Sequence, residues 1–239
     1  MEPENKYNVK VKIDIFLFNL MLVALEIMGI KRAFKYSCRT LRFYTTDSNI
    51  FLCITSTIMM VTALVCIIKK CDIPKAVLIM KYFSVCCITM TFIVVLTVLL
   101  PGKVSDGYGI HIMYKGAQIY HHTVCPMMAI VAFIFIEKKE RFDKLFIRIA
   151  YVPTAIYGVV IIILNLKGIV YGPYPFLRIT TQPVHMSIFW AFVMVVVART
   201  INTIMFYIRH PLRDPEKLKA YVVQKAIVFG RKFREFYEE

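Results

Sequence analysis

The chain has 239 residues, of which 59% are hydrophobic and 14% aromatic, and its formal net charge is +15. A soluble domain of this size has about half of its residues apolar, so this composition excludes one and predicts a polytopic membrane protein. The basic residues are dispersed among short loops between apolar runs, which is typical of membrane topology and does not indicate a nucleic-acid partner.

Six mainly apolar runs are long enough to cross a bilayer, since about 20 helical residues span about 30 Å of hydrocarbon. We expect these spans at residues 13–30, 49–68, 76–100, 117–136, 147–166 and 183–208. The first run has no obvious cleavage site and is expected to be a retained span. The loops leave no room for a second domain. The prediction is therefore an all-α, six-helix transmembrane bundle over residues 1–208, followed by a cytoplasmic tail over residues 209–239.

Basic residues also predict the orientation. The side that holds both termini has 19 lysines and arginines in its loops and ends, and the other side has 9. The excess predicts that both termini are cytoplasmic. Two basic residues lie inside spans. We expect Lys81 to extend to the cytoplasmic interface, whereas Arg199 either extends to that interface or pairs across the bundle.

The tail has the features of an amphipathic helix. Asp214 and Pro215 provide a helix start, and apolar residues then recur at three- and four-residue steps from Leu218 to Phe236, with basic residues largely outside that stripe. This pattern predicts a basic helix lying on the anionic cytoplasmic leaflet, and a solvated tail is the alternative.

The head of the second span, residues 43–50 (FYTTDSNI), is unusually polar for a segment that enters hydrocarbon. One interpretation is structural: Asp47, Ser48 and Asn49 would cap the helix by accepting hydrogen bonds from the amides of its first turn.

The other interpretation is chemical, because the fourth span begins on the same side of the membrane. His121 and His122 lie about one to two turns below its start. A threonine hydroxyl becomes a nucleophile when a base takes its proton, and histidine suits this role near neutral pH. Two adjacent histidines point to different faces of an α-helix, so at most one is expected to face Thr45 or Thr46.

Residues 44–49 (YTTDSN), 122–126 (HTVCP) and 174–177 (YPFL) occur in this order, each near the outer side. These stretches resemble those of the androgen-induced membrane hydrolases, which cleave fatty-acid esters of hydroxy fatty acids, and of their six-span bacterial relatives. The resemblance implies a lipid-like ester substrate drawn from membrane lipids, in the plasma membrane of a bacterium, and no cofactor. The site residues that it implies are a nucleophile, Thr46 or Thr45, a base, His122 or His121, and the supporting residues Asn49, Asp47, Tyr174 and Pro175.

A second hypothesis is a non-enzymatic membrane binder or transporter, one version of which holds a haem between His122 and His185. The sequence has no GxSxG, HExxH, Walker or dinucleotide-binding motif. Its seven cysteines form no CxxC pair, and their positions predict neither a disulfide framework nor a metal site.

Overall fold

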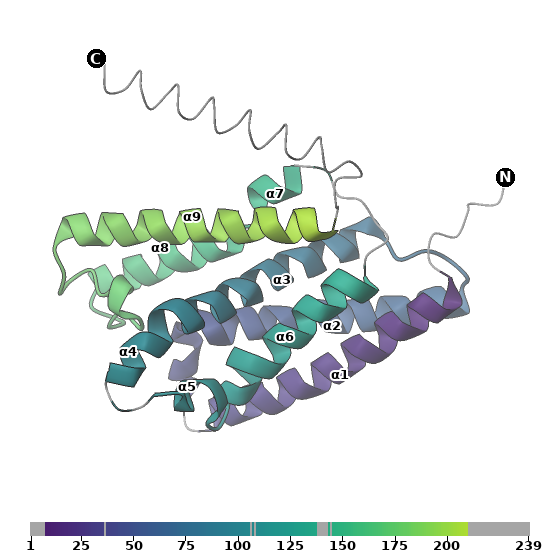
Figure 1. Ribbon diagram of the computed structural model, residues 1–239, viewed down its shortest axis with the longest axis horizontal. Helices are drawn as coiled ribbons and strands as arrows, with labels where there is room; N and C mark the ends of the chain where they lie inside the picture. The colour runs from purple at the N-terminus through teal and green to yellow at the C-terminus, as the bar shows by residue number, and fades with distance from the viewer. Residues whose placement is uncertain are drawn as a thin grey trace, which may run out of the picture.

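The computed structural model describes residues 8–209 apart from 36, 106, 108, 138–142 and 144. Within that part all regular structure is helical, and six helical stretches are long and apolar enough to cross a membrane (Figure 1). These findings confirm the predicted all-α class and its six spans. The amphipathic helix expected after residue 213 lies outside the described residues.

Each span matches a predicted one. Three spans are single helices: α1 (Val9–Phe34), α2 (Tyr44–Ile68) and, as the sixth span, α9 (Val184–Arg209). The third span is α3 (Lys75–Val94), which continues through a π-helical segment (Val95–Leu99) into α4 (Leu100–Ser105). The fourth span consists of a π-helical segment (Ile119–Val124), α6 (Cys125–Val131) and a second π-helical segment (Ala132–Ile136), and the fifth consists of α7 (Leu145–Ile149) and α8 (Val152–Leu166). Shorter elements lie in the loops: two 3₁₀ helices (Cys38–Arg42 and Pro175–Leu177) and α5 (His111–Tyr114). The second span begins five residues earlier than the predicted residue 49.

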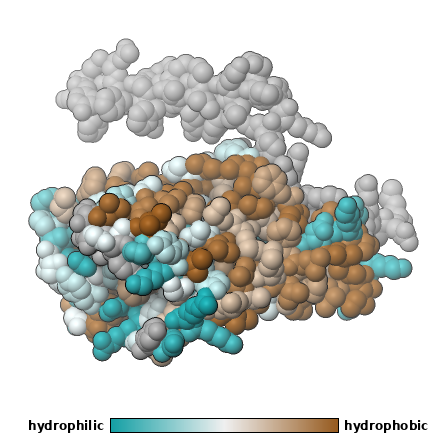
Figure 2. Space-filling model, turned by 60° about the horizontal axis from the view of Figure 1, so that its bottom comes forward, coloured by the Kyte–Doolittle hydropathy of each residue, from teal (hydrophilic) through white to brown (hydrophobic). Residues whose placement is uncertain are grey.

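Successive spans run in opposite directions, so the loops that carry α4, α5 and the Pro175–Leu177 turn gather at one end of the bundle (Figure 1). We call this end of the bundle the loop end. In Figure 1, α1, α2 and α6 lie on one side of α3, and α8 and α9 lie on the other. Figure 2 shows a broad hydrophobic surface over the helices and hydrophilic residues towards the loop end, as expected for helices in contact with hydrocarbon.

A buried polar network joins four spans in the middle of the bundle. Lys81 is 0% exposed, and its ammonium donates to Asn19 Oδ1 at 2.9 Å and to Ser56 Oγ at 2.6 Å. Asn19 in turn donates to Glu137 Oε1 at 3.1 Å. The prediction that Lys81 extends to the interface is therefore wrong. Polar partners inside the bundle satisfy the ammonium where it lies, so it does not need to reach water.

Arg199 is the other basic residue inside a span, and the structure shows it in contact with a neighbouring span. Arg199 is exposed on α9, and its guanidinium lies 5.8 Å from the centroid of the Tyr151 ring. Arg199 therefore contacts an aromatic face on the neighbouring span, and the described residues give it no acidic partner.

Candidate functional site

A cavity of about 650 Å³ lies at the loop end and is lined by 18 residues. It receives side chains from each of the three stretches that the sequence analysis singled out. Those predicted site residues are Thr45, Thr46, His121, His122, Tyr174 and Pro175. The fold thus brings together segments that are up to 130 positions apart in the sequence, and we call this space the polar cavity.

Helix α2 begins in a way that rules out the capping interpretation. Its first residue is Tyr44, and the N-cap residue Phe43 provides no side-chain hydrogen bond. Two of the expected caps lie inside the helix and donate instead of accepting: Ser48 Oγ donates to the carbonyl of Thr45 at 3.1 Å, and Asn49 Nδ2 donates to the same carbonyl at 2.6 Å. Thr45 therefore lies in the first helical turn.

The two threonine hydroxyls have different partners. Thr45 Oγ1 lies 3.3 Å from the Tyr174 hydroxyl, which also accepts the backbone N–H of Thr45 at 3.2 Å. Thr46 Oγ1 lies 2.9 Å from the hydroxyl of Thr40. The unsatisfied first-turn amide of Thr45 is thus bonded by a side chain from a distant loop, which holds that loop over the start of α2.

Tyr174 is held by aromatic neighbours and by burial. Its ring stacks on Phe176 with a centroid distance of 5.3 Å and meets the edge of Phe43 at 6.0 Å. Burial raises the pKa of the Tyr174 phenol above its ordinary value, against the lowering effect of the Thr45 hydrogen bonds. The phenol is therefore neutral across the physiological range and can act as a hydrogen-bond donor.

Both histidines line the polar cavity, and the expectation that at most one of them faces Thr45 or Thr46 stays a prediction. His121 is 2% exposed and His122 is 4% exposed. The reason is local: residues Ile119–Val124 form a π-helical segment. A π-helix has a wider turn than an α-helix, so neighbouring side chains diverge by a smaller angle and two in succession can share one face.

Pro126 explains how this segment joins the rest of the site. In the π-helical pattern the carbonyl of His121 would accept the N–H of residue 126, but proline has none. Asn49 Nδ2 donates to that carbonyl at 3.4 Å instead. Asn49 does not line the polar cavity, so its contribution is to connect α2 to the segment that carries the histidines.

The hydrogen bonds distinguish the two imidazoles. His122 Nδ1 lies 2.6 Å from the carbonyl oxygen of Ile112, and because a carbonyl only accepts, Nδ1 carries the proton. Neutral His122 therefore has a free lone pair on Nε2. The Nε2 atom of His121 is buried and has no hydrogen-bond partner among the described residues. A Cβ atom at Gly29 would lie 3.0 Å from it, so this imidazole packs against α1.

Among the described residues no hydrogen bond joins a threonine of α2 to either histidine, although these side chains line one cavity. Hydrogen bonds at functional sites are often long or absent without a ligand, so the shared cavity is the observation that links these side chains. In the described part of the chain no three or more histidine, cysteine or acidic side chains are placed to hold a metal ion.

Two arginines that the sequence analysis did not single out also line the cavity. Arg32 donates to the Tyr120 hydroxyl and lies 4.8 Å from the centroid of that ring. Arg178 lies 5.0 Å from the centroid of the Tyr171 ring. Among the described residues that line the polar cavity, none is acidic. Arg178 could have been found from the sequence, since it directly follows the YPFL stretch.

Two predicted residues lie elsewhere. Asp47 lines a separate groove of about 520 Å³ between α2 and α8, so the structure does not place it in the polar cavity. His185 is exposed in the first turn of α9 and does not line the cavity that contains His122, so the two proposed haem ligands are not brought together.

Compared with protein-family models, with curated proteins and with solved structures, the chain has no match in any of the three.

Proposed function

We propose that the chain is an integral membrane hydrolase of lipid-like esters, with a threonine at the start of α2 as nucleophile and His122 as its base. The observation that carries this proposal is the polar cavity, where two threonine hydroxyls, a neutral tyrosine and an imidazole with a defined tautomer surround one space. Those are the groups that acyl transfer requires: a nucleophile, a base and a donor for developing negative charge.

The hydrogen bonds around Thr45 support a specific first step. Because the Thr45 amide donates to the Tyr174 oxygen, the phenol proton can point at Thr45 Oγ1 or at a substrate oxygen. The hydroxyl proton of Thr45 is then available to a base. In the proposed step, Oγ1 attacks the ester carbonyl, His122 Nε2 takes its proton, and Tyr174 donates to the oxyanion.

The remaining steps return the enzyme to its starting state. Protonated His122 gives its proton to the departing alkoxide, which leaves as the alcohol. Water then attacks the acyl-threonine with His122 again acting as base, releasing the carboxylic acid and restoring the threonine hydroxyl. No redox partner is needed for this cycle.

The charge of the cavity supports an anionic substrate. Arg32 and Arg178 contribute two guanidinium groups, and the part of the lining that the structure describes contains no acidic side chain. Guanidinium binds carboxylates through paired N–H donors. This is the charge expected for an ester that keeps a free carboxylate, as the family resemblance implies. We further propose that the protein lies in a bacterial plasma membrane with both termini cytoplasmic, which places the polar cavity in the outer leaflet.

Covalent labelling tests the nucleophile. A fluorophosphonate probe on the purified full-length protein, followed by peptide mapping, should modify Thr45 or Thr46, and the matching Thr→Ala variant should not label. The His122→Ala variant should lose labelling and ester hydrolysis to about the same extent as the threonine variant or the double variant, because nucleophile and base act as a unit. Thr57→Ala is the matched control, since Thr57 lies on the same helix and its hydroxyl only bonds Cys53 O.

The opposite outcome is equally clear. A folded Thr45→Ala/Thr46→Ala double variant that still labels and still hydrolyses esters at the wild-type rate removes the proposed mechanism. Loss of activity on His121→Ala alone, with His122→Ala fully active, would transfer the role of base to His121.

A further inference from the structure

A second space extends from the threonine site towards the lipid-facing side. A cavity of about 190 Å³ lies between α8 and α9, and a smaller one of about 80 Å³ lies deeper. Five residues line both: Thr154, Gly158, Phe176, Leu177 and Met194. The two spaces are therefore adjacent, and we call them together the acyl groove.

The acyl groove meets the polar cavity at the proposed nucleophile. Thr45 and Tyr174 line both the deep part of the groove and the polar cavity. Thr46 lines only the polar cavity. A molecule that occupies both spaces therefore passes the hydrogen-bonded pair formed by Thr45 and Tyr174.

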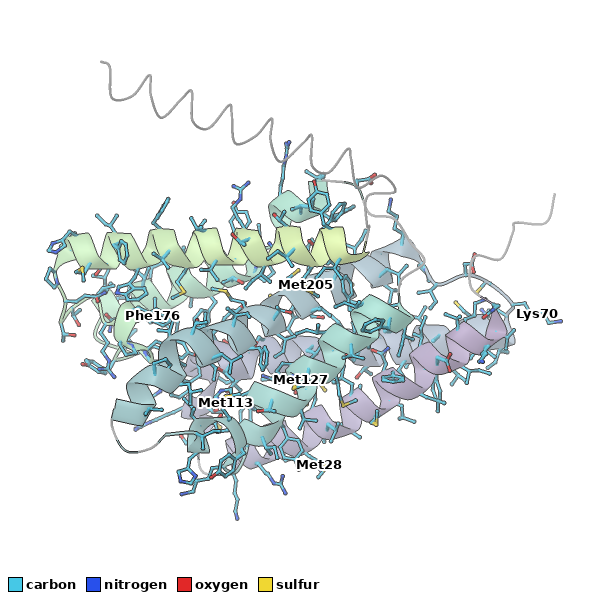
Figure 3. The ribbon with its side chains drawn as sticks, in the orientation of Figure 1. Met28, Lys70, Met113, Met127, Phe176 and Met205 are labelled. Atoms are coloured by element: carbon cyan, nitrogen blue, oxygen red, sulfur yellow. The ribbon has the colours of Figure 1, made fainter. Side chains whose placement is uncertain are left out.

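Small side chains explain why the groove is open. Gly158 and Ala155 on α8 face it together with Ala191 and Ala198 on α9. In membrane bundles small residues usually let helices pack closely. Here the space above them is bounded by larger rings, since Trp190 lies 5.8 Å from the Phe176 ring, centroid to centroid. Figure 3 labels Phe176 beside α9 at the loop end.

The chemistry of the walls selects the occupant. Thr154 and Ser187 supply hydroxyls and Tyr151 a phenol, and the other side chains on the α8–α9 part of the groove are apolar or aromatic. Its walls are spans that lie in hydrocarbon, so the molecules at its mouth are lipid chains. We propose that this groove binds the acyl chain of the ester substrate, with the ester carbonyl at Thr45 and the charged end in the polar cavity.

This inference rests on the proposed hydrolase and makes it more specific. It selects Thr45 over Thr46 as nucleophile, because only Thr45 lies where the apolar and polar spaces meet. It also gives the acyl chain of the ester that the resemblance implies a binding site between α8 and α9.

The chain contains a natural fluorescent probe for binding in the acyl groove. Trp190 is the only tryptophan in the sequence and lines the groove. A bromine-labelled, non-hydrolysable long-chain ester analogue, titrated at low mole fraction into nanodiscs that hold the full-length protein, should quench Trp190 fluorescence saturably. An unlabelled long-chain analogue should reverse the quenching, and a short-chain analogue should not.

Filling the groove provides the matched comparison. A Cβ atom at Gly158 meets no atom within 4 Å, so Gly158→Phe places a ring in the open space. The variant should weaken the saturable quenching at least tenfold and lower kcat/KM for long-chain esters by a similar factor, while leaving short-chain hydrolysis unchanged. Ala191→Phe, from the opposite wall, should act in the same direction. Ile163→Phe is the control, because Ile163 is exposed on the same helix and lines neither part of the groove.

The possible results separate the two proposals. Quenching that rises without saturation, equally in wild type and Gly158→Phe, reports contact with bulk lipid and overturns the groove. Hydrolysis of both chain lengths that Gly158→Phe leaves unchanged also overturns it, while the hydrolase stands. Saturable quenching that Gly158→Phe abolishes, in a protein that hydrolyses no ester, supports the groove as a lipid-chain site and removes the hydrolase.

Discussion

The hydroxyl of Tyr174 lies within hydrogen-bonding distance of both the side chain and the backbone amide of Thr45, at 3.3 and 3.2 Å, although 129 positions separate the two residues. This contact joins the last loop before α9 to the first turn of α2. It satisfies a helix-start amide that no local side chain caps. It also places a neutral hydrogen-bond donor beside the proposed nucleophile.

Replacing that donor should separate catalysis from stability. Tyr174→Phe keeps the ring packing and removes only the hydroxyl, so we expect kcat to fall about a hundredfold while unfolding stability falls by about 1 kcal/mol. Burial raises the pKa of this phenol, so the neutral donor persists at alkaline pH and the loss should be constant from neutral to mildly alkaline buffer. Ester hydrolysis across pH and thermal unfolding measure the two effects.

Tyr171→Phe is the matched control for that variant. Tyr171 lies in the same loop, and its ring contact with Arg178 does not need the hydroxyl. The control should keep wild-type activity. Equal losses in both variants would show that the loop responds to any change of hydroxyl and that Tyr174 has no special role.

Gly29 allows the closest approach between α1 and the histidine segment. A Cβ atom there would lie 2.7 Å from Tyr120 Cβ and 2.9 Å from the His121 ring. Gly29→Ala should therefore displace the π-helical segment and cost about 1 to 3 kcal/mol of unfolding stability by overpacking. We expect hydrolysis to fall with it, because His122 moves together with His121. Thermal unfolding and hydrolysis on the same preparation measure both.

Gly158→Ala is the control for overpacking, since a Cβ atom at that position meets nothing within 4 Å. It should be neutral or slightly stabilising, because alanine favours helix over glycine by about 1 kcal/mol. A Gly29→Ala variant as stable and active as this control would show that α1 can move away from the histidine segment at no cost.

The sequence was sufficient for the spans, because membrane thickness sets helix length and every predicted run corresponds to a helical stretch. The start of α2 was misplaced for a physical reason. Asp47, Ser48 and Asn49 have the side chains of helix caps, but the amide at the true start is satisfied by Tyr174 from a distant loop. Local capping rules cannot detect a partner supplied by tertiary structure.

The sequence predicted which residues line the polar cavity better than it predicted their geometry. An α-helical period separates His121 from His122, whereas the π-helical segment brings both into the cavity. Pro126, five positions after His121, was the available signal for a disturbed hydrogen-bond pattern. The buried partners of Lys81 had a signal too, because Asn19 and Glu26 lie seven positions apart and so share one face of α1.

Two native cysteines test the orientation of the bundle. Cys38 and Cys71 are exposed, and they lie at opposite ends of α2. With both termini cytoplasmic, a membrane-impermeant maleimide added to intact cells should label Cys38, whereas Cys71 should label only after permeabilisation. Cys38→Ser and Cys71→Ser variants identify each labelled site. The reverse pattern would put the termini outside and the polar cavity on the cytoplasmic side.

The last prediction concerns the buried cation. Lys81→Met keeps a long unbranched side chain but removes the donor that Asn19 and Ser56 accept from. It also removes the positive charge that acts on two carboxyl groups, first that of Glu137 and then that of Glu26, both of which are 0% exposed. Removing one partner of a buried charge pair costs about 3 to 5 kcal/mol, so we expect a large loss of unfolding stability.

A second substitution separates the charge from the packing. Glu26→Gln added to Lys81→Met removes one of these two carboxyl groups, so the double variant should recover part of the lost stability, a non-additivity that independent sites do not show. Lys69→Met is the control, because Lys69 is exposed at the end of α2 and its loss should change stability by less than about 0.5 kcal/mol. Thermal unfolding of wild type, Lys81→Met, Glu26→Gln and the double variant in one detergent measures the cycle, with Lys69→Met measured beside them. If Lys81→Met were as stable as the Lys69→Met control, the ammonium would have to reach the interface, as expected from the sequence alone, and the network between Asn19, Ser56 and Lys81 would carry no stabilising energy.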